Sequence, residues 1–143
     1  MKKSSALKCI VTGGGGFIGS HLVDGLLALG HQVTILDNFS TGRRSNLFHH
    51  IKKNVRIIKI DISKNVQLKK YFKGASYVFH LAGLASFLPS IKNPNKYFRS
   101  NVVGTFNVIQ AAKKINIKKF IYTASASCYG IPDKLPTSEN AKI

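Results

Sequence analysis

A glycine-rich segment near the N-terminus constrains the fold of this chain more than any other feature. Its glycines are spaced three residues apart: Gly13, Gly16 and Gly19. They follow a short apolar run, Cys9 to Val11, and precede apolar residues at helical spacing: Ile18, Leu22, Leu26 and Leu29. This pattern predicts a strand, a tight turn and a helix, with Gly30 at the helix C-terminus. A flexible loop is the alternative interpretation. In a strand–turn–helix unit, backbone N–H groups at the helix N-terminus can hold a pyrophosphate.

A carboxylate after the next apolar run strengthens the phosphate-binding interpretation. The run Val33–Leu36 ends at Asp37, 18 residues beyond Gly19. An acidic residue about 20 residues after such glycines can accept hydrogen bonds from the adenosine ribose hydroxyls of a dinucleotide. Its charge favours NAD over NADP, because it repels a 2′-phosphate. Arg43 and Arg44 follow closely, and they either bind such a phosphate or contact solvent or the edge of the cofactor.

The rest of the chain alternates between predicted strands and helices. Strands are predicted at Cys9–Val11, Val33–Leu36, Val55–Ile60, Tyr77–Leu81 and Phe120–Ala124. Helices are predicted from the glycine turn to Leu29, near Ser45–Ile51, over Asn65–Phe72, and from Asn93–Pro94 to about Ile115. This alternation predicts one α/β domain, residues 1–143, with a doubly wound, parallel, Rossmann-type sheet in the strand order 3-2-1-4-5. Ligands of such sheets bind at the carboxyl ends of the strands.

The last predicted helix carries apolar residues on one face: Phe98, Val102, Phe106, Ile109 and Ala112. Gly104 lies within it, where glycine costs about 1 kcal/mol relative to alanine. Close packing against a strand or cofactor explains such a glycine; the alternative is that the position is indifferent.

Charge and cysteine content narrow the classes of function. The formal net charge is +17, and lysines occur in scattered pairs such as Lys69–Lys70 and Lys118–Lys119. Nucleic-acid or anionic-membrane binding is one interpretation, but the sequence has no aromatic-basic stripe, so a lysine-rich surface is favoured. No apolar run reaches the length of a membrane span. Cys9 and Cys128 form no disulfide framework and no metal signature, which favours a cytoplasmic protein without a metal.

Six segments of the chain form a recognisable set of motifs: Thr12 to His21 (TGGGGFIGSH), Leu36 to Gly42 (LDNFSTG), Asp61–Ile62, His80 to Gly83 (HLAG), Asn101 to Asn107 (NVVGTFN) and Phe120 to Gly130 (FIYTASASCYG). Together these segments resemble the extended short-chain dehydrogenase/reductase family, in particular its NAD-dependent nucleotide-sugar epimerases of the UDP-glucose 4-epimerase kind. They occur in order over nearly all of the chain.

The resemblance implies an NAD site. The pyrophosphate and adenosine half is assigned to Gly13, Gly16, Phe17, Ile18, Gly19, Asp37, Asn38, Ser40, Thr41, Gly42, Asp61 and Ile62. In this assignment Phe17 and Ile18 offer backbone N–H groups to the pyrophosphate. The nicotinamide half is assigned to Leu81, Ala82 and Gly83, with Ser100 at a position where some epimerases place an asparagine. Ala85 stands where some epimerases carry a lysine that contacts the cofactor.

Ser125 matches the active-site Ser/Thr of the family, whose hydroxyl bonds the reacting sugar oxygen. An ordinary strand-end hydroxyl, bonded to its own backbone, is the alternative. Related dehydratases and decarboxylases carry acidic residues just after this position, whereas here Ala126 and Ser127 follow. Neither can transfer a proton near neutral pH, which favours epimerisation through hydride transfer at sugar C4. Another extended-family oxidoreductase or dehydratase and a non-catalytic NAD-binding module remain alternatives.

The proton-transfer pair of the family, Tyr-x-x-x-Lys, is missing from the sequence. None of the five tyrosines is followed four residues later by a lysine. The family places the pair roughly 20 residues beyond Tyr129, so we expect the chain to be a truncated NAD-binding part without the later strands and the substrate lobe. We expect it to be inactive alone. For the complete enzyme, the resemblance implies a UDP-hexose substrate and a homodimer.

Overall fold

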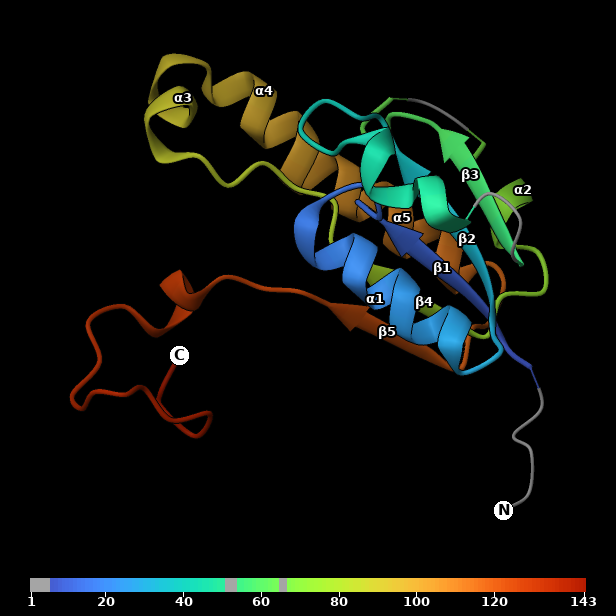
Figure 1. Ribbon diagram of the computed structural model, residues 1–143. Helices are drawn as coiled ribbons and strands as arrows, with labels where there is room; N and C mark the ends of the chain where they lie inside the picture. Colours follow the sequence, from blue (N-terminus) through green and yellow to red (C-terminus); the bar gives the residue numbers. More distant parts are fainter. Residues whose placement is uncertain (1–5, 51–53, 65–66) are drawn as a thin grey trace.

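A computed structural model describes residues 6–50, 54–64 and 67–143 of the chain. Its strands are β1 (Lys8–Thr12), β2 (Gln32–Asp37), β3 (Val55–Lys59), β4 (Tyr77–His80) and β5 (Lys119–Tyr122). They form one parallel sheet in the order β3-β2-β1-β4-β5 (Figure 1). The predicted α/β fold and strand order are therefore confirmed. The predicted strands differ from the observed ones by no more than two residues at either end.

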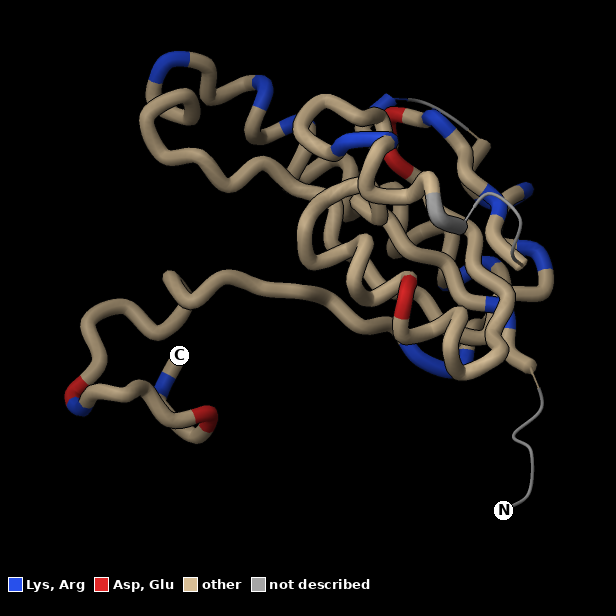
Figure 2. Tube along the Cα trace, in the orientation of Figure 1, with Lys and Arg blue, Asp and Glu red and all other residues tan. Residues whose placement is uncertain are grey.

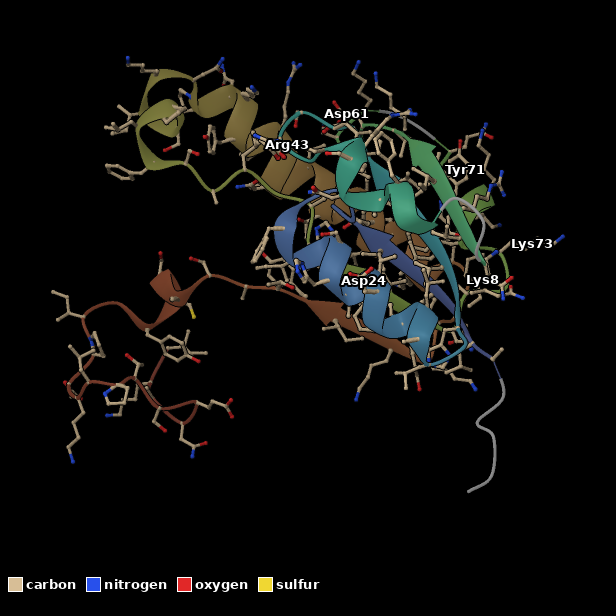
Figure 3. The ribbon with its side chains drawn as sticks, in the orientation of Figure 1. Lys8, Asp24, Arg43, Asp61, Tyr71 and Lys73 are labelled. Carbon is tan, nitrogen blue, oxygen red and sulfur yellow. The ribbon has the colours of Figure 1, made fainter. Side chains whose placement is uncertain are left out.

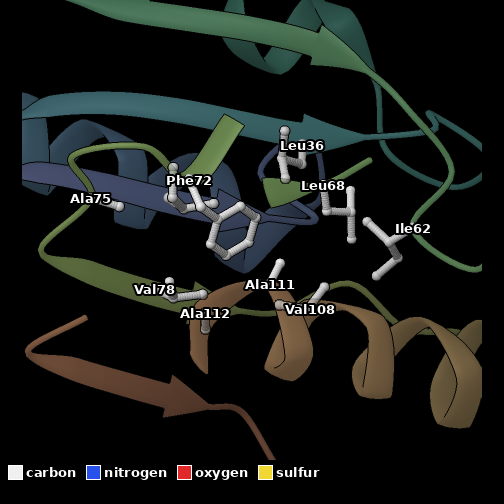
Figure 4. Close-up of a cluster of buried hydrophobic side chains, with 10 residues drawn as sticks. Leu36, Ile62, Leu68, Phe72, Ala75, Val78, Val108, Ala111 and Ala112 are labelled. Carbon is white, nitrogen blue, oxygen red and sulfur yellow. The ribbon is translucent and has the colours of Figure 1, made fainter. Parts of the chain in front are cut away.

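Neighbouring residues of a strand point to opposite faces of the sheet, and helices cover both of these faces. Cys9 and Val11 of β1 pack with α1 (Phe17–Ala28) and with Leu47 of the 3₁₀ helix η1 (Arg44–His50). Ile10 points the other way, into a cluster with α2 (Lys69–Phe72) and α5 (Gly104–Lys113), which Figure 4 shows around Phe72. The central strand is therefore buried on both faces, as is typical of a parallel sheet.

The first helix buries a face that matches the predicted one only in part: Leu26 is buried and Leu22 is partly buried, as expected. Its buried residues are Gly19, Ser20, Val23 and Leu26. Ile18 and Leu29, which we expected on the apolar face, are 62% and 73% exposed. The helix turns its glycine side inward, because Gly19 packs directly against the backbone of the glycine turn. The helix ends at the predicted place, with Leu29 as C-cap and Gly30 beyond it at φ 81°.

The long helical segment begins as predicted. The side chain of Asn93 accepts a hydrogen bond from the N–H of Lys96 (3.2 Å), and Pro94 occupies the first turn. The segment is α4 (Pro94–Phe98), a π-helical stretch η2 (Arg99–Val103) and α5. Between β4 and this segment lies a short helix, α3 (Phe87–Lys92), where the sequence pattern predicted no helix.

The predicted apolar stripe on this segment is largely exposed. Phe98, Val102 and Phe106 are each more than half exposed, and Ile109 is 45% exposed. The helix packs on the sheet through its smaller residues: Gly104, Val108, Ala111 and Ala112. A Cβ on Gly104 would lie 3.0 Å from Cγ1 of Ile62, so close packing does explain this glycine, although its neighbour is a loop residue.

Of the two remaining predicted helices, the first is a 3₁₀ helix and the second is short. The helix predicted at Ser45–Ile51 is η1, and Ile51 lies outside the described residues. Of the helix predicted from Asn65, only α2 is observed, and Asn65 also lies outside the described residues. After β5 comes one further 3₁₀ turn, η3 (Ala126–Tyr129), and the chain then runs away from the sheet (Figure 1). In the part of the chain that the structure describes, no helix has the length and apolarity to cross a membrane. Lys and Arg lie at several separate places along the trace, with none between Lys8 and Arg43 (Figure 2).

Candidate functional site

One cavity lies where the carboxyl ends of β1, β2, β3 and β4 meet. Its lining residues are Gly13, Gly16, Leu36, Asp37, Asn38, Ser40, Thr41, Gly42, Ile60, Asp61, Ile62, Leu81, Ala82, Gly83, Leu84 and Ser100. The structure thus brings together every residue predicted for the cofactor except Phe17, Ile18 and Gly19. Figure 3 shows Asp61 and Arg43 at this end of the sheet, with Lys8 and Lys73 at the opposite end.

Sequence reasoning missed three apolar members of this lining, Leu36, Ile60 and Leu84. Each is a direct chain neighbour of a residue that was predicted. Their positions could have been predicted, because ligands of such sheets bind beside the carboxyl ends of the strands.

The glycine turn is compact enough that side chains would not fit at two of its positions. Gly13 has φ 71°, and a Cβ on it would lie 2.7 Å from the backbone N of Ala82. A Cβ on Gly19 would lie 2.2 Å from the carbonyl O of Gly13. The turn therefore holds β1, α1 and the segment after β4 in direct backbone contact.

The N-terminus of α1 opens onto this cavity. Gly16, which lines the cavity, is the N-cap residue, and it has no side chain to satisfy the first-turn N–H groups. Those N–H groups have no partner within the helix. Phe17 and Ile18 are 78% and 62% exposed and do not line the cavity themselves. Free N–H groups at a helix N-terminus are groups that can bind an anion.

Asp37 has a structural role that the sequence did not reveal. The residue is 7% exposed, and its Oδ2 accepts a hydrogen bond from the N–H of Gly15 (2.8 Å). Oδ1 accepts another from the N–H of Phe39 (2.7 Å), a residue with φ 57°. Each carboxylate oxygen has a second lone pair, so capacity remains to accept from ribose hydroxyls. Asp37 thus fixes the glycine turn as well as lining the cavity.

The loop after β2 is tied to the same turn. The carbonyl of Gly15 accepts from the N–H of Arg43 (2.9 Å) and from the side-chain amide of Asn46 (2.9 Å). The guanidinium of Arg44 lies over the Phe39 ring, 5.1 Å from its centroid. The loop is therefore positioned by contacts at both ends.

Asp61, at the end of β3, remains readily ionised. Partial burial acts to raise its pKa, but the N–H and hydroxyl of Ser63 both donate to Oδ1, at 3.0 and 2.7 Å. With the charge of Lys64 and a hydrogen bond from Asn38, these contacts hold the pKa of Asp61 below its usual value. The cavity therefore carries one carboxylate at the end of β2 and another just beyond β3.

Ser125 does not line the cavity. It is exposed at the start of η3, where its Oγ accepts from the N–H of Ser127 (3.2 Å) and donates to Oγ of Ser127 (3.1 Å). This is the local bonding expected for an ordinary strand-end hydroxyl. Its catalytic role stays a prediction.

The chain has a parallel doubly wound sheet, a glycine turn, an acidic residue at the end of its second strand and a cavity at the carboxyl ends of the strands. These features define a Rossmann-type nucleotide-binding domain. The chain belongs to the NAD dependent epimerase/dehydratase family, whose family model matches residues 9–143.

Relatives of this chain act on different UDP-sugars. It is 36% identical to the bifunctional UDP-glucose 4-epimerase and UDP-xylose 4-epimerase 1 of Pisum sativum, over 98% of this chain and 43% of the relative. It is 39% identical to UDP-glucuronic acid decarboxylase 4 of Arabidopsis thaliana, over 96% of this chain and 30% of the relative. Among solved structures, UDP-N-acetylglucosamine 4-epimerase from Methanobrevibacter ruminantium M1, in complex with UDP-N-acetylmuramic acid, matches with a TM-score of 0.87 and 40% identity. That match covers 97% of this chain and 44% of the other. The chain spans less than half the length of each of these proteins.

Proposed function

We propose that this chain is the NAD-binding portion, residues 1–143, of a nucleotide-sugar epimerase of the UDP-hexose 4-epimerase kind. The observation that supports the proposal most is the cavity described above, which gathers the glycine turn, Asp37, Asp61 and the Leu81–Gly83 segment. Family membership supports NAD as the cofactor.

The residues present fit this cofactor. In the proposed arrangement, the first-turn N–H groups of Phe17 and Ile18 bind the pyrophosphate, since they lie at a helix N-terminus without a side-chain cap. Asp37 accepts from the ribose hydroxyls through its remaining lone pairs. Gly16 lines the cavity without a side chain, which leaves the backbone open where the phosphates approach.

In the proposed reaction, bound NAD supplies a reversible hydride acceptor for sugar C4. Ser125 would hydrogen-bond the sugar oxygen there. The base of the family is the tyrosine of Tyr-x-x-x-Lys, and none of the five tyrosines has a lysine four residues later. We therefore propose that these 143 residues bind NAD without turning over UDP-glucose, and a coupled assay for UDP-galactose should show no rate above background.

Decarboxylation of a UDP-sugar acid is the second candidate, because decarboxylases share up to 39% identity with this chain. Ala126 and Ser127 argue against it, since neither supplies an acid or base near Ser125. The whole product of the gene should convert UDP-glucose and leave UDP-glucuronic acid unchanged. Release of CO₂ from UDP-glucuronic acid would favour the second candidate instead.

For the complete enzyme we also propose a cytoplasmic homodimer. The exposed stripe of Phe98, Val102 and Phe106 on the long helix supports the dimer, because large apolar side chains that are exposed together mark an interaction surface. Sedimentation of the complete protein with and without Phe106→Glu tests it; a monomer in both cases contradicts it.

Isothermal titration calorimetry with NAD and NADP tests the cofactor proposal. We expect this chain to bind NAD more tightly than NADP, because the Asp37 carboxylate would face the 2′-phosphate of NADP. Equal or tighter binding of NADP contradicts the role given to Asp37. Binding of neither would leave the family fold without its expected cofactor and would overturn the proposal.

A further inference from the structure

A buried histidine stands directly behind the cavity. His80, the last residue of β4, is 1% exposed. Its Nδ1 lies 2.6 Å from Oγ1 of Thr12 at the end of β1, and its Nε2 lies 2.8 Å from Oγ1 of Thr105 in α5. The imidazole therefore joins β1, β4 and α5.

The neighbouring bonds fix which ring nitrogen carries the proton. The hydroxyl of Thr105 donates to the carbonyl of Asn101 (2.6 Å), and a hydroxyl has a single proton. Thr105 must then accept from His80, so Nε2 carries the hydrogen and Nδ1 is the acceptor. Thr12 donates to Nδ1, and its oxygen in turn accepts from the N–H of Ala82 (3.2 Å). Every group in this chain of bonds has a partner when the ring is neutral.

The other end of the same chain of bonds returns to the cavity. The side chain of Asn101 accepts from the N–H of Leu84 (2.8 Å) and donates to the carbonyl of Leu84 (2.9 Å). A closed circuit therefore runs from Ala82 through Thr12, His80, Thr105 and Asn101 to Leu84. The three residues that it spans, Ala82 to Leu84, all line the cavity.

We propose that His80 is a positioning residue for the cofactor cavity, whose neutral ring sets the place of the Ala82–Leu84 backbone against the glycine turn. This segment lies so near the glycine turn that a Cβ on Gly13 would be 2.7 Å from the N of Ala82. The circuit prevents it from moving away. This inference rests on the proposed function, and it names the group that controls the nicotinamide side of the cavity.

A second proton on the ring would break the circuit. Nδ1 would then carry a hydrogen and would need the hydroxyl oxygen of Thr12 as its acceptor. The hydroxyl proton of Thr12 would lose Nδ1 as its acceptor, and Thr12 is 0% exposed, so water could not replace it. The ring's partners are the two threonine hydroxyls and the rings of Phe120 and Tyr122, at 6.1 and 5.8 Å, and none is a carboxylate. Burial accordingly lowers the pKa of His80 from 6.5 to about 4, so the ring stays neutral at physiological pH.

Two substitutions of His80 distinguish the effect of its hydrogen bonds from the effect of its side-chain volume. Gln has an acceptor and a donor that can bond Thr12 and Thr105, whereas Phe fills the space and bonds neither. At pH 7.5 we expect His80→Phe to weaken NAD binding about tenfold, as the loss of two buried hydrogen bonds predicts, and His80→Gln to restore most of the affinity. Val108→Ala is the matched control, because it destabilises the same face of the sheet from outside the cavity; its NAD affinity should equal that of wild type.

The circuit itself can be read without NAD. Long-range ¹H–¹⁵N spectra of wild type should show the neutral Nε2–H tautomer, and Thr105→Val should speed hydrogen exchange at the amides of Ala82 and Leu84. Wild-type NAD affinity in His80→Phe, or an Nδ1–H tautomer in wild type, overturns the inference. Failure of wild type to bind NAD, with the tautomer and exchange as expected, counts against the proposed function and leaves the circuit in place.

Discussion

Replacing Gly19 by alanine should destabilise this chain, although alanine is the better helix former. In an exposed helix interior the change from glycine to alanine stabilises by about 1 kcal/mol. At Gly19 the new Cβ would lie 2.2 Å from the carbonyl O of Gly13, about 1.2 Å closer than ordinary contact at 3.4 Å. The obstacle is backbone on both sides, so α1 must move away from the turn. Overpacking of this kind costs about 1–3 kcal/mol. Because the gain of about 1 kcal/mol offsets part of this cost, we expect a net loss of about 1 kcal/mol in the free energy of unfolding.

The same helix supplies the control. Gly25 is also within α1, and a Cβ on it would meet nothing within 4 Å. Gly25→Ala should therefore raise the free energy of unfolding by about 1 kcal/mol. Urea unfolding followed by circular dichroism measures both variants. If Gly19→Ala is as stable as Gly25→Ala, the packing of α1 against the glycine turn is not as described.

Three further predictions concern the cavity. Between the native pKa of His80, about 4, and its unfolded value of 6.5, the unfolded chain binds more protons; lowering the pH from 7 to 4 should therefore remove about 3 kcal/mol of stability through this group. Urea midpoints of wild type and His80→Gln against pH measure this loss, and an equal loss in both refutes it. Asp37→Asn should weaken NAD binding about tenfold, because an amide has one acceptor oxygen where the carboxylate has two. It should also narrow the preference for NAD over NADP, because the negative charge that would face the 2′-phosphate is removed; calorimetry measures both effects. Ser125→Ala should leave NAD affinity unchanged, since Ser125 lies outside the cavity, and a clear loss would place Ser125 beside the cofactor.

Features encoded by neighbouring residues could be predicted from the sequence. The strands follow from short apolar runs bounded by glycines, which are local features of the sequence. Their order follows from the right-handed crossover rule, which applies to parallel sheets in general. The cavity lining could be anticipated because the carboxyl ends of parallel strands share one edge. Asp37 and Asp61 were found in this way.

Features that depend on fit between distant segments could not be predicted. The buried face of α1 is set by the contact of Gly19 with Gly13, which overrides the apolar spacing of Ile18 and Leu29. The role of His80 depends on partners 68 and 25 residues away.

For Ser125 the sequence match named a role, while the structure shows only a local turn. A catalytic function would depend on where Ser125 lies relative to a bound substrate, and a sequence motif does not specify that position.

A crystal structure of the chain grown with NAD tests the proposed site most directly. We predict that the pyrophosphate lies on the N–H groups of Phe17 and Ile18, with a ribose hydroxyl bonded to Asp37 and the nicotinamide beside the Ala82–Leu84 segment. Cofactor density elsewhere on the molecule, or a cavity without cofactor at saturating NAD in a correctly folded chain, would contradict the proposal.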